Sequence, residues 1–272
     1  MSTMITMKEA LEAIKEEPER RHIVNISGGK DSAALALYLK LNFPEIPAEY
    51  VFCDTKCELP ETYDFLEKLE RLLGKKIERI NAFNYLNIDE KDRNPFDIFL
   101  NEIYSNFLPS ARSRWCTGTL KIKPLEKHLE GSLAISYIGI RGDEDREGYK
   151  GKKPPVFSQK PTIQAVYPFR DGEIGIDGVR DILEETGLGW PSYYDWRSRS
   201  GCYFCFYQQI GEWQNLKKHH PDLFEKAKEY ERKIGDKQFT WVQGKTLDQV
   251  VAGKQKEIQP VDETNGCAIC HL

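Results

Sequence analysis

A segment with two glycines, a lysine and an aspartate has the composition of a phosphate-binding loop. Residues 27–32 read Ser-Gly-Gly-Lys-Asp-Ser and directly follow a mostly β-branched run from His22 to Ile26. An Ala/Leu-rich stretch, Ala33 to Leu41, comes next and predicts a helix. Glycine lets the backbone bend sharply, and the free N–H groups of a helix's first turn attract an anion. The segment therefore predicts a phosphate site, with an ordinary Gly-rich turn and a surface lysine as the alternative.

The cysteines are the second group of side chains that could do chemistry. Of the seven, four form two Cys-x-x-Cys pairs, Cys202 with Cys205 and Cys267 with Cys270. This spacing places two sulfurs on one side of a tight turn, where both can bind one metal ion. An odd cysteine count in a highly charged chain argues against a disulfide framework. From the spacing alone, zinc, an iron–sulfur cluster, redox chemistry and unmetallated buried thiols all stay open.

Alternating strands and helices must position these residues. Strands are predicted at residues 22–26, 49–53, 77–80, 134–140 and 163–167. Helices are predicted at residues 7–17, 33–41, 60–73, 97–104, 120–129, 177–186, 212–218, 221–234 and 246–251. This alternation indicates an α/β fold with a doubly wound, mostly parallel, Rossmann-like sheet. Ligands of such sheets bind beyond the carboxyl ends of the strands, so the loop at 27–32, Asp54 and Thr55 are expected on one rim.

We expect a larger N-terminal domain at residues 1–160 and a smaller, Cys-rich, mainly helical part at residues 161–272. The boundary is placed at the basic connector from Lys150 to Pro161, which contains glycine and proline. A formal net charge of -4 argues against a general nucleic-acid coat. No apolar run approaches the roughly 20 residues that cross a membrane, and the start has no signal-peptide pattern. The expected protein is therefore soluble and cytoplasmic, without a membrane partner.

Five sequence blocks carry a resemblance to a known family. They are Ser27–Ser32; Asp54-Thr55 with Glu58 and Pro60–Thr62; Arg114–Thr117 with Lys121 and Pro124; Gly139–Arg141; and Ser200–Cys205 with Trp213 and Pro221. In these blocks, which run from about residue 22 to residue 230, the chain resembles the PAPS-reductase-like branch of the PP-loop ATP pyrophosphatase superfamily.

The resemblance implies that the chain binds ATP and Mg²⁺. The implied nucleotide-binding residues are Ser27, Gly28, Gly29, Lys30, Asp31, Ser32, Asp54, Thr55, Arg114, Lys121, Gly139 and Arg141. The implied catalytic residues are Lys30, Asp31, Asp54 and Arg141. In PP-loop enzymes the loop holds the pyrophosphate end of ATP while an acceptor oxygen attacks the α-phosphorus, and Asp31 or Asp54 is expected to place the metal.

The resemblance also favours an iron–sulfur cluster, because relatives that sulfurate nucleic acid carry a [4Fe–4S] cluster near the ATP site. The implied ligands are Cys116, Cys202, Cys205 and Cys270, with Cys267 as the alternative fourth ligand. Zn²⁺ bound by the paired cysteines is the alternative. Cys53 and Cys57 are expected to be buried or incidental thiols, with a sulfur-carrying role of one of them as the alternative.

The implied function is conversion of ATP to AMP and pyrophosphate, with adenylation of an acceptor oxygen before sulfur is inserted. The closest type is that of DndC and SspD, enzymes of DNA phosphorothioation, with a cysteine desulfurase as the sulfur donor. Nucleic acid is then an expected partner, DNA more than RNA, and the resemblance is compatible with an oligomeric protein. The residues that could line its path are Arg112, Arg114, Trp196, Arg197 and Arg199, with core packing or an ordinary solvated surface as the alternative for each.

Two further functions stay open. One is a PAPS or APS reductase, although the Glu-Cys-Gly-(Leu/Ile)-His tail expected of such an enzyme is only loosely echoed at residues 267–272. The other is a non-catalytic nucleotide-binding partner in a sulfur-transfer complex.

Overall fold

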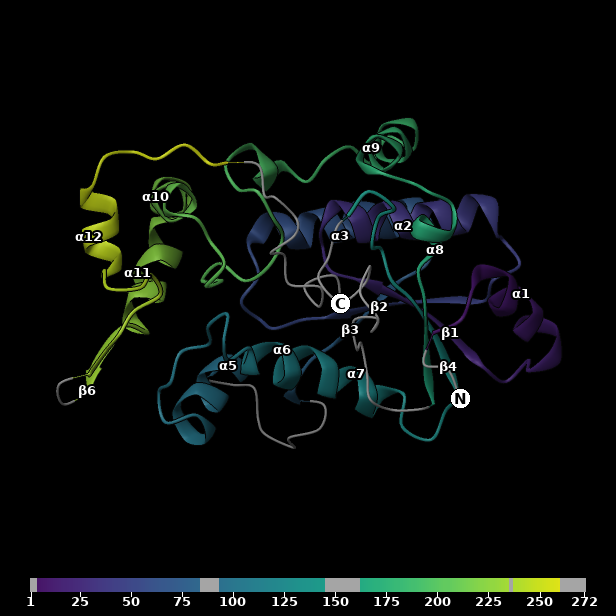
Figure 1. Ribbon diagram of the computed structural model, residues 1–272, viewed down its shortest axis with the longest axis horizontal. Coiled ribbons are helices and arrows are strands. Elements are labelled where there is room, and N and C mark those ends of the chain that lie inside the picture. The colour runs from purple at the N-terminus through teal and green to yellow at the C-terminus, as the bar shows by residue number, and fades with distance from the viewer. Residues whose placement is uncertain (1–3, 84–92, 145–161, 235–236, 260–272) are drawn as a thin grey trace.

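The computed structural model describes residues 4–83, 93–144, 162–234 and 237–259. At residues 232–234, 237 and 238 it describes the backbone alone. Its centre is a five-stranded sheet in the order β3-β2-β1-β4-β5, and every neighbouring pair is parallel (Figure 1). The strands are β1 (Arg21–Ile26), β2 (Ala48–Cys53), β3 (Ile77–Ile80), β4 (Ala134–Tyr137) and β5 (Ile163–Val166). The predicted doubly wound α/β fold is therefore confirmed.

Both faces of the sheet are covered, because alternate residues of each strand pack into different apolar clusters. In β1, Val24 and Ile26 belong to one cluster and Ile23 to another. The first cluster receives residues of α1 (Met7–Glu16), α2 (Lys30–Asn42), α3 (Pro60–Leu73) and α9 (Ile176–Glu185). The second receives residues of α7 (Lys123–His128), and Figure 1 shows α7 across the sheet from α2 and α3.

A second, aromatic core lies beside the sheet. It is made by residues around α5 (Pro95–Ile98), the π-helix η1 (Phe99–Ile103), α6 (Trp115–Thr117), α10 (Ile210–His219), α11 (Pro221–Glu229) and α12 (Leu247–Ala252). In Figure 1 the helices α10 to α12 lie at the end of the molecule opposite α1. The remaining elements are the π-helix η2 (Gly118–Ile122), α8 (Pro168–Asp171), the 3-10 turn η3 (Ser192–Asp195) and the antiparallel pair β6 (Arg232–Ile234) and β7 (Lys237–Phe239).

Two predicted boundaries are wrong. The helix predicted at 221–234 ends at Glu229, because Tyr230 turns into the aromatic core and residues 232–234 pair with β7. The strand predicted at 134–140 is paired only over Ala134–Tyr137, since its neighbour β5 ends at Val166. In both cases apolar residues continue past the end of the element, because the chain stays buried after its regular backbone hydrogen bonding stops.

The sheet extends across the division predicted between residues 160 and 161. Strand β5 forms its edge beside β4, and Val179 and Leu183 of α9 are buried in the same cluster as α2. Conversely, Phe96, Trp115 and Leu120 belong to the aromatic core together with residues of α10 and α11. The two-domain division stays a prediction, and the connector from Lys150 to Pro161 lies outside the described residues. None of the helices described in the chain is long and apolar enough to span a membrane.

Candidate functional site

The loop at residues 27–32 leads from β1 into the first turn of α2. Gly28 has a φ of +75°, in the left-handed region, and a Cβ there would lie 2.5 Å from Cγ2 of Thr62. Gly29 is the N-cap of α2, and a Cβ there would lie 2.7 Å from Oγ of Ser200. Both positions therefore lack room for a side chain, and α3 and the segment before Cys202 close over the loop.

Two serines hold the loop in shape. Oγ of Ser32 accepts a hydrogen bond from the N–H of Ser27 at 3.0 Å and donates to the carbonyl of Gly29 at 3.1 Å. Oγ of Ser27 accepts from the N–H of Gly29 at 3.3 Å. The carbonyl of Gly28 accepts from the hydroxyl of Tyr193, on η3, at 2.7 Å. The loop is thus fixed by hydrogen bonds at both of its ends and from the C-terminal part of the chain.

A buried charge cluster stands at the start of α2. Oδ2 of Asp31 is 2.9 Å from Nζ of Lys30, and Oδ1 is 3.0 Å from Nη1 of Arg141. The guanidinium of Arg141 also faces Asp143 at 2.8 Å and Glu144 at 3.2 Å. Arg141 reaches this position because β4 lies next to β1 in the sheet. The structure thus brings together Lys30, Asp31 and Arg141, which the sequence predicted as catalytic.

Backbone contact holds Arg141 close to the loop. A Cβ at Gly139 would lie 3.0 Å from the carbonyl oxygen of Asp31, so this position accepts only glycine without a backbone shift. Lys30 is further covered by aromatic rings, with Nζ 5.5 Å from the ring centroid of Tyr194 and 6.0 Å from that of Trp190. The C-terminal part therefore forms one wall of the phosphate loop, a role that the sequence pattern does not reveal.

Asp54 and Thr55 follow β2 on the same rim. Oδ1 of Asp54 accepts from the N–H of Lys56 and from the hydroxyl of Tyr63, both at 2.8 Å. Burial and the Asp54 charge raise the pKa of Tyr63, so this hydroxyl stays protonated and donates. The hydroxyl of Thr55 donates to Oε1 of Glu58 at 2.8 Å and lies 3.3 Å from Sγ of Cys202. This loop therefore touches both the nucleotide rim and the cysteines.

Three predicted metal ligands share one small cavity. Cys116, Cys202 and Cys205 line a space of about 40 Å³, together with Thr55 and Lys121. Within the described part of the chain, no group of three His, Cys, Asp or Glu side chains is arranged to hold a metal ion. The predicted fourth ligand, Cys270, and its alternative, Cys267, both lie outside the described residues. Cys116, Cys202 and Cys205 thus line one cavity, and their ligation of a metal stays a prediction.

Burial controls the chemistry of the thiols. It raises the pKa of Cys202 well above its ordinary value, and the nearby Glu58 carboxylate adds to the shift. Burial likewise raises the pKa of Cys53 to about 12 and that of Cys57 well above its usual range. Cys53 and Cys57 are thus buried thiols, as predicted.

Two residues proposed to line a nucleic-acid path do not lie on the surface. Arg197 is 1% exposed, and its guanidinium donates to the carbonyls of Gly201 at 3.1 Å and Cys202 at 2.8 Å. Trp196 is buried and stacks on His219. That prediction is wrong for both residues. The guanidinium of Arg197 is the buried donor to the peptide carbonyls around Cys202, and the indole of Trp196 packs in the aromatic core. Arg112 and Arg114 are exposed.

The fold resembles a solved structure. The phosphoadenylyl-sulfate (PAPS) reductase of Candida auris, in its phosphate complex, matches with a TM-score of 0.50 and 14% identity, over 75% of this chain and 90% of that one. The U34-tRNA thiolase NcsA of Methanococcus maripaludis, with its [4Fe-4S] cluster, matches with a TM-score of 0.39 and 17% identity, over 82% and 77% of the two chains. The first match supports the fold, and the second is too weak to support a conclusion.

Two curated relatives come from Methanocaldococcus jannaschii. The uncharacterized protein MJ0066 is 28% identical over 239 residues, which are 82% of this chain and 44% of the relative. The uncharacterized protein MJ0973 is 22% identical over 271 residues, covering 94% of this chain and 60% of the relative. The chain thus spans about half the length of the curated relatives it matches.

The family match falls on the part of the chain that forms the sheet and its rim. Residues 21–171, more than half of the sequence, match the phosphoadenosine phosphosulfate reductase domain. This range contains the phosphate loop, Asp54, Cys116 and Arg141 and includes all five strands of the sheet. The chain therefore belongs to the phosphoadenosine phosphosulfate reductase domain family of the PP-loop superfamily.

Proposed function

We propose that this protein is an ATP pyrophosphatase, which converts ATP to AMP and pyrophosphate while adenylating an acceptor oxygen for sulfur incorporation. The acceptor is a nucleic acid, DNA rather than RNA, in a reaction of the phosphorothioation type. One observation carries the proposal. The loop from Asp54 to Glu58 has Asp54 on the nucleotide rim and the Thr55 hydroxyl 3.3 Å from Sγ of Cys202. A nucleotide site and a group of thiols that share one wall suit adenylation followed by sulfur transfer.

In this proposal the β- and γ-phosphates of ATP bind to the loop at residues 27–32 through its backbone N–H groups. The acceptor oxygen forms a bond to the α-phosphorus, the bond between that phosphorus and its bridging oxygen breaks, and pyrophosphate leaves with the electron pair. Lys30 and Arg141 stabilise the charge that develops on the leaving group. Their 2.9 Å and 3.0 Å contacts with Asp31 keep both cations at the start of α2.

Asp54 suits Mg²⁺ better than Asp31 does. Both carboxylate oxygens of Asp31 face a cation, Lys30 or Arg141. In contrast, within the described part of the chain Oδ2 of Asp54 has only the Lys56 ammonium as an ion-pair partner, at 3.5 Å. We therefore assign Asp54 as the residue that would hold Mg²⁺, which would supply further charge neutralisation at the phosphates.

The sulfur atoms that line the cysteine cavity are donors of the type that soft metal ions prefer. Cys116, Cys202 and Cys205 line it with the apolar side chains of Phe96 and Leu120, among others. Thiolates are the ligands of iron–sulfur clusters and of structural zinc, and coordination would deprotonate the buried thiols. We propose these three residues as ligands of a [4Fe–4S] cluster, completed by Cys270 or Cys267, with Zn²⁺ as the alternative. A bound cluster would supply iron that can carry the sulfur to be transferred.

The test is pyrophosphate release from ATP and Mg²⁺ by anaerobically purified protein, with single-stranded or duplex DNA and a cysteine desulfurase present. Lys30→Ala and Asp54→Asn should each lower the rate at least a hundredfold, since each removes a charge at the phosphates. Lys68→Ala, at an exposed lysine of α3, is the matched control. Absence of pyrophosphate under all these conditions would contradict the proposal. Iron and acid-labile sulfide are measured in parallel, and zinc alone would reject the cluster.

The family match favours one second candidate, a sulfonucleotide reductase. Such an enzyme would release sulfite from PAPS or APS with a thiol reductant and would not need ATP turnover. Sulfite formation without pyrophosphate formation would select this function over the first.

A further inference from the structure

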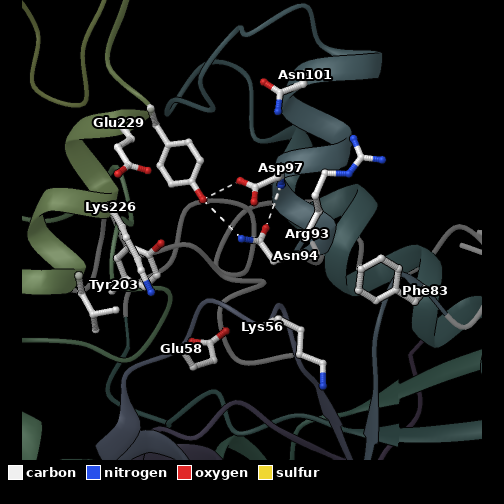
Figure 2. A pocket seen from close by; sticks show the side chains of 12 residues that line it. Lys56, Glu58, Phe83, Arg93, Asn94, Asp97, Asn101, Tyr203, Lys226 and Glu229 are labelled. Atoms are coloured by element: carbon white, nitrogen blue, oxygen red, sulfur yellow. Dashed lines mark hydrogen bonds between the residues drawn. The ribbon is translucent and has the colours of Figure 1, made fainter. Parts of the chain in front are cut away.

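A second, larger cavity lies next to the nucleotide rim, between the loop after β2 and the helices α5 and α11. Its volume is about 710 Å³. The described residues that line it include Glu58, Asn94, Asp97, Tyr203, Lys226 and Tyr230. Figure 2 shows Lys56 and Glu58 at one end, with Asn94 and Asp97 across from them and Lys226 at the side. None of the residues predicted to bind ATP lines this cavity, which shares only the loop after β2 with the rim.

The wall across from Glu58 is a fixed polar surface. The hydroxyl of Tyr230 donates to Oδ1 of Asp97 at 2.7 Å and accepts from Nδ2 of Asn94 at 3.5 Å. The side-chain oxygen of Asn94 accepts from the N–H of Asp97 at 2.9 Å, as the N-cap of α5. These bonds hold an amide, a carboxylate and a phenol in place before any ligand arrives, which lowers the cost of binding a polar ligand.

Glu58 presents an unsatisfied oxygen at the other end. The residue is 6% exposed, and its Oε1 accepts from the Thr55 hydroxyl at 2.8 Å. Its Oε2 is buried and has no hydrogen-bond partner among the residues that the structure describes. A buried carboxylate oxygen without a partner is costly, so it indicates a ligand group that completes the pairing. The polar edge of a nucleobase, with its N–H groups, has the required chemistry.

The cations of the cavity differ in how firmly they are already paired. Arg93 is 2.5 Å from Glu102, and Lys56 is 3.5 Å from Asp54. Lys226 is exposed on α11 and has no ion-pair partner among the residues that the structure describes. It is therefore the cation best placed to bind an anion from solution.

We propose that this cavity binds the acceptor nucleotide, with a phosphate at Lys226 and the polar edge of the base at Glu58. A nucleotide combines an anion, a donor-bearing ring edge and an aromatic face, which match Lys226, Glu58 and the ring of Tyr203. The proposal rests on the proposed function in one respect: an acceptor must approach the ATP rim, and the loop after β2 borders both spaces. A nucleotide within a strand and a free nucleotide share this chemistry, so the experiment must separate them.

The experiment measures binding of fluorescein-labelled 12-mer DNA and RNA single strands to the full-length protein by anisotropy, at several salt concentrations. Lys226→Ala should weaken binding roughly tenfold and reduce the slope of log K against log salt by about 0.7, the value for one phosphate contact. Glu58→Gln should weaken binding severalfold and leave that slope unchanged, because it alters a base contact. Lys218→Ala, at an exposed lysine of α10, is the matched control for charge.

Competition by unlabelled AMP and CMP distinguishes a free nucleotide from a nucleotide within a strand as the ligand of the cavity. Displacement of the strand by micromolar mononucleotide assigns the cavity to free nucleotides, and no displacement assigns it to a nucleotide in a strand. Equal affinities of the wild type, Lys226→Ala and Glu58→Gln for every probe would overturn the proposal. ATP binding and pyrophosphate release by the same variants are recorded separately. Cavity-dependent binding without pyrophosphate release would reject the proposed function alone, and pyrophosphate release with unchanged strand binding would reject only this inference.

Discussion

At the scale of single residues, Gly28 is the position where backbone and packing leave the least freedom. Gly28→Ala should destabilise the fold by about 2–4 kcal/mol, because it adds left-handed backbone strain to a 2.5 Å clash with Thr62. Gly131→Ala separates the two causes, since Gly131 has a φ of +82° but nothing within 4 Å of the added Cβ. Urea unfolding should show a loss of only about 1–2 kcal/mol at Gly131. Equal losses at both positions would contradict the steric explanation.

His22 sets part of the pH dependence of stability. It is buried in β1 with Nδ1 2.8 Å from the Tyr137 hydroxyl, and its Nε2 has no partner among the described residues. Burial, and then the Arg20 charge, lower the pKa of His22 below 6.5. Below that pH the unfolded chain binds a proton that the folded chain does not, so the free energy of unfolding falls as the pH decreases.

Urea unfolding should show this loss as a decrease in the free energy of unfolding from pH 7 to pH 5.5. His22→Leu removes the titrating group and should flatten the curve in this range, whatever its effect on stability at pH 7. His219→Gln, at an exposed histidine, is the control variant. A His22→Leu curve that runs parallel to the wild type would argue against a role for His22.

At the scale of elements, two segments position the thiols. The helical stretch from Trp115 to His128 contains the π-helix η2, whose wider turn lets Cys116 in α6 and Lys121 in η2 line the same cavity. Opposite it, the turn that carries Cys202 is held by Arg197, which donates hydrogen bonds to the backbone carbonyls of Gly201 and Cys202. The first segment is set by local chain geometry and the second by a buried side chain.

Arg197→Met should destabilise the protein by about 3 kcal/mol, because it leaves two buried carbonyls without their charged donor. If the cysteine cavity holds a metal, its content per chain should fall as well. Urea unfolding and metal analysis check the two effects, and Arg112→Met, at an exposed arginine, is the control. A stable Arg197→Met protein with unchanged metal content would show that the turn does not depend on this guanidinium.

At the scale of the whole molecule, the two cores depend on both halves of the chain. A fragment of residues 1–160 would lose β5 and α9 from the sheet and the partners of Phe96 and Trp115 in the aromatic core. It should therefore be insoluble or lack a cooperative unfolding transition, and a 1–189 fragment should do no better, since it restores only the sheet. Circular dichroism and urea unfolding of the soluble fractions test this. A stable 1–160 fragment would instead support the predicted domain division.

The sequence by itself determined the elements of the sheet and the residues on its rim. Hydrophobic patterns of strands and helices are local, and parallel strands necessarily place their carboxyl ends on one edge, so Lys30, Asp54 and Arg141 could be assigned together. Gly28 and Gly29 predicted a tight loop, because the conformational freedom of glycine is also a local property of the sequence.

Only the tertiary structure decided what surrounds that rim. The Thr55–Cys202 contact and the cavity at Glu58 join residues far apart in the sequence. Such contacts depend on how the aromatic core packs against the sheet, and spacing along the chain does not encode them. An arginine that reads as a surface cation was therefore a buried donor, and Glu58, a member of a recognised motif, became the candidate contact for the acceptor.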